Sequence, residues 1–133
     1  MNKIKFKSFK KKSGTLIPFS IKKSFPIKIK RIFIINGKKN FIRGDHAHKR
    51  CSQFLFPVLG KIKVEFISKF KNGSIVLDYS KKEGYLLKPK TWCKIKFLTN
   101  NAILLVACDM EYDFKDYIEK YSEFLKIIRK KKR

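Results

Sequence analysis

The chain has 133 residues and a formal net charge of +24, because 34 Lys and Arg face only 10 Asp and Glu. This length fits one domain, and the 44% of hydrophobic residues can fill its core. The charge predicts an anionic partner, either a polyanion or a small substrate such as a nucleotide. A general lysine bias of the surface explains the charge equally well, since the lysines are spread over the whole chain.

Three cysteines, Cys51, Cys93 and Cys108, stand far apart and form no C-x-x-C pair. This pattern argues against a disulfide scaffold or a zinc ribbon, and it predicts a reducing, cytoplasmic setting. The first residues alternate lysine with apolar side chains and lack the apolar core of a signal peptide. No stretch of about 18 apolar residues predicts a membrane span.

Most of the chain predicts short strands, roughly nine or ten at the even spacing of a sandwich or barrel. The expected strands lie within residues 2–9, 28–36, 52–60, 61–68, 70–79, 84–89, 91–99 and 101–109. Turn signals separate several of them. Gly60 predicts a hairpin-like reversal between two apolar runs, and Asn72-Gly73 predicts a second turn.

The last part of the chain has a different period. Apolar side chains recur at helical i, i+3, i+4 and i+7 spacing, namely Tyr117, Ile118, Tyr121, Phe124, Leu125 and Ile128. We therefore predict one amphipathic helix at about 114–130. No repeat or linker divides the sequence, so residues 1–133 are expected to form a single domain.

Both histidines of the chain, His46 and His48, fall two residues apart. On a strand, such residues point to the same face. Two imidazoles on the inner wall of a barrel can clamp a metal ion or act as a proton-transfer pair. They can also be ordinary polar residues.

The spacing around the pair resembles that of cupins, which are small double-stranded β-helix (jelly-roll) barrels. Gln53 and Gly60 occupy the positions where the pattern H-x-H-x4-E-x6-G has Glu and Gly, and Lys94 stands where a final His ligand is expected after Pro89. A divalent metal site normally needs at least three protein ligands. We therefore expect an all-β cupin fold with a C-terminal α-helix and without a metal; a metal-dependent cupin enzyme is the alternative.

A more specific resemblance extends over nearly the whole chain. The stretch "RGDHAH" at 43–48, the ending "EYDFKDYIEKYSEF" at 111–124, the segment at 17–33 and "LKPKTW" at 87–92 are similar to the sugar-nucleotide 3,4-ketoisomerases that act on dTDP-4-keto-6-deoxyglucose. The resemblance implies an isomerase that uses neither cofactor nor metal. It also implies a homodimer that exchanges N-terminal strands.

The implied reaction moves a ketone from C4 to C3 of the hexose through an enediol or enediolate. The product would be a 3-keto sugar for 3-amino sugars of surface glycans such as lipopolysaccharide. By match to the family motif, His46 is the first choice for the proton-shuttling group, and His48 is the second acid or base. Arg43 would bind the pyrophosphate or the enediolate, Gln53 would hydrogen-bond the sugar, and Gly44 would allow close backbone approach.

Two further residues are candidates for substrate binding. Arg31 can bind a phosphate, and Trp92 can stack on thymine, although a single Trp is more often part of a core. Family members often have Tyr where this chain has Ile34, so Tyr85 is considered as a replacement hydroxyl. A polyanion-binding module is a further alternative, but no aromatic stacking motif accompanies the charge, and we expect no nucleic-acid partner.

Overall fold

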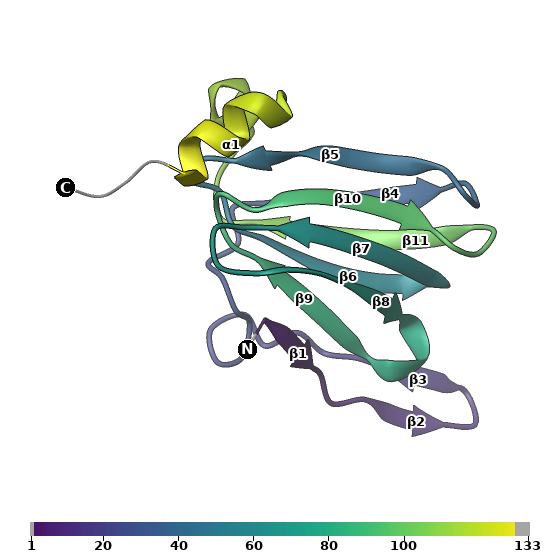
Figure 1. Ribbon diagram of the computed structural model, residues 1–133. Coiled ribbons are helices and arrows are strands. Elements are labelled where there is room, and N and C mark those ends of the chain that lie inside the picture. The colour runs from purple at the N-terminus through teal and green to yellow at the C-terminus, as the bar shows by residue number, and fades with distance from the viewer. Residues whose placement is uncertain (1, 130–133) are drawn as a thin grey trace.

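The computed structural model describes residues 2–129, which form two five-stranded antiparallel sheets that face each other (Figure 1). The first sheet contains, in spatial order, β1 (Lys3–Lys5), β9 (Glu83–Leu87), β6 (Gln53–Leu59), β11 (Ala102–Cys108) and β4 (Arg31–Gly37). The second contains β12 (Tyr117–Ile118), β5 (Ile42–His48), β10 (Trp92–Phe97), β7 (Lys61–Ile67) and β8 (Asn72–Asp78). The remaining elements are β2 (Phe9–Lys11), β3 (Gly14–Leu16), two 3-10 turns, η1 (Tyr79–Lys81) and η2 (Phe114–Asp116), and α1 (Tyr121–Arg129).

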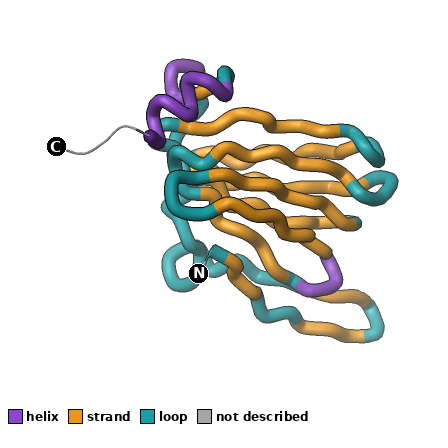
Figure 2. Tube along the Cα trace, viewed as in Figure 1, coloured by secondary structure: helices purple, strands orange, loops and turns teal. Residues whose placement is uncertain are grey.

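The main core fills the space between the two sheets. Alternate residues of the strands point inward, and the largest fully buried ones include Phe97, Ile62 and Leu104. Figure 2 shows strands through most of the molecule, with loops at both ends of the sheets and a longer loop segment between β3 and β4. The all-β prediction is confirmed. Within the described residues the two sheets are not hydrogen-bonded into a closed barrel.

The N-terminal segment covers the outer face of the first sheet. Phe6 lies at the centre of this contact, with its ring centroid 4.7 Å from Phe19 and 5.7 Å from both Phe54 and Phe56. Aromatic rings at such edge-to-face distances attract one another beyond their burial. Strand β1 pairs with β9, whereas β2 and β3 form a hairpin separate from both large sheets (Figure 1).

The structure differs from two of the predicted hairpins. At Gly60 the chain passes from β6 in the first sheet to β7 in the second, so the two strands do not form a hairpin. Asn72 and Gly73 lie inside β8, because the turn occurs earlier, at 68–71. There the Ser68 hydroxyl donates to the carbonyl of Lys71 at 3.1 Å and closes the turn.

The C-terminal helix is shorter than predicted. Residues before Tyr121 are not α-helical, since Asp113 caps the turn η2 and the chain then extends as β12 to pair with β5. The helical spacing at 117–118 therefore reflects burial on a short strand. Helix α1 ends at Arg129, and the predicted last position, 130, lies outside the described residues. Over residues 2–129, no helix is long and apolar enough to span a membrane.

Candidate active site

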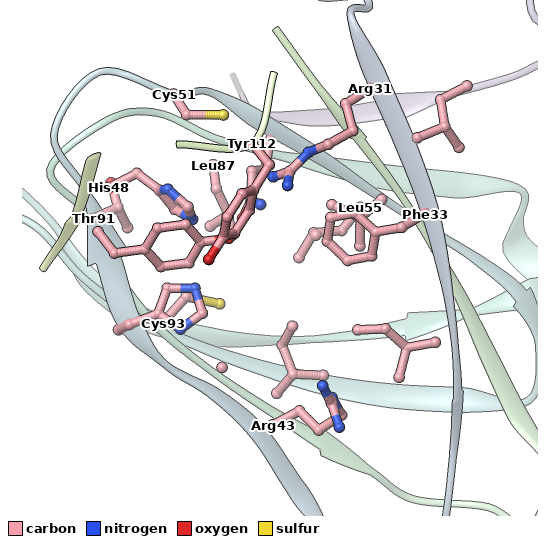
Figure 3. A pocket seen from close by; sticks show the side chains of 18 of the residues that line it. Arg31, Phe33, Arg43, His48, Cys51, Leu55, Leu87, Thr91, Cys93 and Tyr112 are labelled. Atoms are coloured by element: carbon pink, nitrogen blue, oxygen red, sulfur yellow. The ribbon is translucent and has the colours of Figure 1, made fainter. Parts of the chain in front are cut away.

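A cavity of about 460 Å³ lies between the two sheets and contains both histidines (Figure 3). Strands β4, β5, β6 and β10 contribute its walls, together with the segment around η2. Of the residues predicted from the sequence, the structure brings together Arg31, Arg43, Gly44, His46, His48 and Gln53. Trp92 is not among the residues that line this cavity.

A β-bulge in β5 sets which side chains enter the cavity. Strand β10 pairs Cys93 with His46 and Lys94 with Gly44, so Asp45 is an extra residue without a partner. Gly44 and Asp45 both have positive φ, 84° and 62°. A Cβ atom on Gly44 would lie 3.0 Å from the carbonyl oxygen of Cys93, so glycine is required for close backbone approach as well as for φ.

The bulge has a direct consequence for the site. In a regular strand, Arg43 and His46 would point to opposite faces because they are three residues apart. With one residue inserted, both line the cavity. The Asp45 side chain instead points to the outer face, where it accepts a hydrogen bond from Trp92 Nε1 at 3.0 Å.

The two imidazoles are neighbours, with ring centroids 5.1 Å apart. His48 is held by a buried carboxylate that the sequence analysis did not identify, because His48 Nδ1 lies 3.2 Å from Asp116 Oδ2. Asp116 is 2% exposed and also accepts hydrogen bonds from the backbone N–H groups of Arg50 at 2.8 Å and Cys51 at 3.2 Å. These contacts fix the carboxylate and, through it, the imidazole.

The surroundings of both histidines favour the neutral form of the imidazole ring. Burial lowers the pKa of His46 below its usual value, with hydrogen bonding to the Gly44 backbone opposing it. Burial and then the neighbouring His46 lower the pKa of His48, while Asp116 partly counteracts them. His48 Nε2 is buried and has no hydrogen-bond partner among the described residues. A neutral imidazole with an unused nitrogen is a suitable proton acceptor.

Two tyrosines that sequence reasoning did not select also line the cavity. The Tyr117 ring centroid lies 4.3 Å from His48 and 5.1 Å from His46, and Tyr112 lies against Arg31. Both belong to the "EYDFKDY" stretch, so the resemblance of this ending to the family was the available signal. Strand β12 brings Tyr117 to this position by pairing with β5.

The hydroxyl considered at Tyr85 is not at the site. Tyr85 is buried in the main core, where its ring stacks on Phe66 at 5.2 Å. Ile34, where family members often have Tyr, is 63% exposed and lies outside the cavity. Tyr112 and Tyr117 are therefore the phenol groups available to the histidines.

The two arginines occupy different parts of the cavity (Figure 3). Arg31 is half-buried, and its guanidinium carbon lies 5.3 Å from the Phe33 ring centroid and 5.5 Å from that of Tyr112. Arg43 is exposed. Gln53 begins β6 and reaches the same wall as Arg31.

Trp92 is a core residue of a different region. It is 5% exposed and packs against Tyr121 and Phe124 of α1, with centroid distances of 5.2 and 5.5 Å. This cluster lies on the face of β10 away from the histidines. Trp92 is therefore not placed to stack on a base in this cavity. Its side chain attaches α1 to the sheet instead.

A metal site is not favoured by the available donors. Lys94 is outside the cavity, with Nζ 4.0 Å from Asp45 Oδ1. His48, Cys51 and Asp116 bring potential ligand atoms within 4.8 Å of one another. However, Asp116 already accepts two backbone hydrogen bonds, and the neighbouring Cys108 together with burial raises the pKa of Cys51 above its usual range. Metal independence stays a prediction.

Known proteins resemble the chain over almost its full length. A family model described as "FdtA: WxcM-like, C-terminal" matches residues 1–129. The TDP-4-oxo-6-deoxy-alpha-D-glucose-3,4-oxoisomerase of Aneurinibacillus thermoaerophilus is 31% identical over 128 residues, covering 96% of this chain and 91% of that protein.

Solved structures agree with this relationship. A 3,4-ketoisomerase from Helicobacter canadensis has a TM-score of 0.88 and 29% identity, with 96% of both chains covered. The sugar 3,4-ketoisomerase QdtA from Thermoanaerobacterium thermosaccharolyticum, in complex with TDP, has a TM-score of 0.88 and 30% identity, covering 96% of this chain and 93% of that one. A histidine-to-asparagine variant of QdtA holds TDP-4-keto-6-deoxyglucose.

The fold and these relatives therefore place the chain in the class of sugar-nucleotide ketoisomerases, and the resemblance seen in the sequence is confirmed. The chain belongs to the FdtA family (WxcM-like, C-terminal).

Proposed function

We propose that the chain isomerises dTDP-4-keto-6-deoxyglucose to the corresponding 3-keto sugar by histidine acid–base catalysis. A base removes the proton from C3, the electron pair of the broken C3–H bond forms the C3–C4 double bond, and the C4 carbonyl oxygen takes the negative charge of an enediolate. Carbon C4 then takes up a proton, the C3 hydroxyl loses its proton and becomes the ketone, and the C4 oxygen takes up a proton and becomes a hydroxyl. The observation that carries the proposal is the neutral histidine pair inside the cavity of a chain related to such isomerases.

His48 is the better placed group for the first proton transfer. Asp116 at 3.2 Å holds Nδ1 and leaves the buried Nε2 without a partner, which is the arrangement by which a carboxylate orients a catalytic imidazole. The motif alone favoured His46 for this role. The His46 ring, whose centroid lies 5.1 Å from that of His48, is then the group that delivers the proton to C4.

The developing negative charge needs donors near the two histidines. Arg31 and Tyr117 both line the cavity, and the Tyr117 ring lies 4.3 Å from the His48 ring. We assign them to the enediolate oxygen, because fixed donors at such a position stabilise the transition state more than the ground state. Gln53, on the same wall, is assigned to a sugar hydroxyl.

Arg43 is assigned to the pyrophosphate of the nucleotide. It is exposed on β5 and lies apart from Arg31 (Figure 3). A guanidinium binds phosphate oxygens with two parallel hydrogen bonds and remains charged at all working pH values.

The direct test follows the purified protein with dTDP-4-keto-6-deoxyglucose in D2O by NMR. We expect conversion to the 3-keto sugar, with deuterium at C4 of the product and, through reversal of the first step, at C3 of the remaining substrate. The C4 configuration is read from the product. A parallel reaction with a chelator should proceed at the same rate. Chelator-sensitive turnover that returns on adding a divalent metal favours the metal-dependent alternative instead.

We also propose a homodimer with exchanged N-terminal strands. The support is twofold: Ile32 and Ile34 are exposed on the edge strand β4, and the β2–β3 hairpin pairs with neither large sheet in the described chain. Sedimentation of the protein and of an Ile34→Lys variant tests this, with a monomeric variant expected.

The setting proposed is the cytoplasm, supported by three free, buried cysteines. The product then serves an aminotransferase of surface-glycan synthesis. Nucleic acid is not a proposed partner. If the +24 charge instead serves nucleic-acid binding, DNA or RNA will bind with a steep dependence on salt concentration.

A further inference from the structure

One buried cysteine lies at the centre of the wall that carries Arg31 and Gln53. Cys108 lies on β11, which runs between β4 and β6. It is paired with Arg31 of β4 on one side and with Gln53 of β6 on the other. Its sulfur accepts a hydrogen bond from Arg31 Nη2 at 3.5 Å and another from Gln53 Nε2 at 3.5 Å. Cys108 itself is 0% exposed.

Arg31 has no other anionic partner in the described part of the chain. None of the ion pairs there includes it, and its Nε atom is buried without a hydrogen-bond partner. A partly desolvated guanidinium normally needs a compensating charge. The Cys108 sulfur is the group in position to supply one.

The ionisation of Cys108 agrees with this geometry. The neighbouring Cys51 thiol, followed by the hydrogen bonds from Gln53 and Arg31, lowers the pKa of Cys108 to about 6 against the opposing effect of burial. The same contact raises the pKa of Cys51, which therefore keeps its proton. The charged or titratable groups of this neighbourhood are Arg31, His48, Cys51, Asp109, Asp116 and Tyr117.

We propose that Cys108 is a positioning residue: its sulfur is the resident anion of Arg31 and fixes the Gln53 amide, so that both side chains are oriented before the substrate enters. Cys108 acts through these two residues and does not touch the substrate. The inference rests on the proposed function, because Arg31 and Gln53 matter for the reaction only if they contact the sugar.

An alanine variant and a serine variant of Cys108 test the role in catalysis. Cys108→Ala is expected to lower kcat by about 10- to 100-fold with little change in KM. The free energy of a hydrogen bond to a charged group corresponds to a rate factor of this size when it is lost in the transition state. Cys108→Ser, which keeps an acceptor oxygen, should recover part of the loss.

The charge is tested independently by the ultraviolet absorbance of the thiolate during a pH titration. Wild-type protein should show a thiolate appearing near the pKa of about 6. This signal should disappear in Cys108→Ser and move to higher pH in Arg31→Gln.

The proposal is overturned if Cys108→Ala keeps kcat within about twofold of the wild-type value, or if the thiolate signal persists in Cys108→Ser. If Cys108→Ala does not fold, the serine variant and the titration still decide the question. A wild-type protein that converts no substrate contradicts the proposed function, whereas the titration still establishes or excludes the anion at Cys108.

Discussion

Two hollows of similar size lie on opposite faces of β5 and β10, and only one of them contains the histidines. The inner cavity measures about 460 Å³ and the outer one about 430 Å³. The inner one contains two arginines and both imidazoles. The outer one is lined by three of the ten acidic residues of the chain, Asp45, Glu65 and Glu119, beside Trp92 and Lys94.

The two hollows therefore differ in the charge of the residues that line them and hardly in volume. An anionic sugar nucleotide is attracted by the inner arginines and repelled by the outer carboxylates. The outer hollow also contains the aromatic ring that the sequence favoured for base stacking, and there it joins α1 to the sheet. The following four predictions test whether function belongs to the inner face alone.

The largest effect is expected for His48→Asn. Loss of the proposed base should lower turnover by about 10²- to 10⁴-fold and abolish deuterium exchange at C3. NMR in D2O measures both. His46→Asn should retain exchange at C3 and lose product formation. The opposite pattern, with exchange lost only in His46→Asn, would return the role of base to His46.

The next effect is expected for Asp116→Asn, with a decrease in kcat of about 10²-fold through loss of imidazole orientation. Asp116 raises the pKa of His48 against burial, so removing its charge lowers that pKa further. The neutral imidazole then persists to lower pH, and the acid limb of the kcat profile should move to lower pH. A shift to higher pH would contradict this electrostatic role, and a melting curve reports whether the variant remains folded.

A smaller effect is expected for Arg43→Gln, which should weaken binding of TDP by about 10- to 100-fold while kcat is retained. Lys94→Gln is the matched control, because it removes one positive charge from the outer hollow. Calorimetric titration with TDP compares the two. Equal losses of affinity would mean that general charge, and not the Arg43 contact, binds the nucleotide.

The smallest effect on activity is expected for Trp92→Phe, which should change KM by less than about twofold. The hydrogen bond to Asp45 and part of the packing on Phe124 are lost, so the free energy of unfolding should fall by about 1–2 kcal/mol. Denaturant unfolding and steady-state kinetics measure the two quantities. A tenfold increase in KM with unchanged stability would place the nucleotide in the outer hollow.

Local patterns predicted the strands well, because alternation in stretches such as 61–67 reflects burial on one face. They failed where tertiary pairing decides the outcome. Nothing local distinguishes a hairpin at Gly60 from a crossing between sheets. Likewise, the apolar spacing at Tyr117 and Ile118 fits either a helix or a strand, and pairing with β5 selects the strand.

The site was predictable to the extent that its residues lie within one motif. Arg43, Gly44 and His48 are within six positions of one another, and the structure brings them to one cavity. Asp116 was missed because it is 68 residues from His48, and only the fold brings the two together. The role of Cys108 depends on strand register across three strands, which no local pattern specifies.

The bulge at Asp45 makes substrate affinity and proton transfer depend on a single inserted residue. Deleting Asp45 would restore a regular strand and send either Arg43 or the histidines to the outer face. Such a chain could hold the nucleotide without isomerising the sugar, or carry the imidazoles without holding the nucleotide. Insertion and deletion, more than substitution, are therefore the changes that can separate recognition from chemistry in this protein.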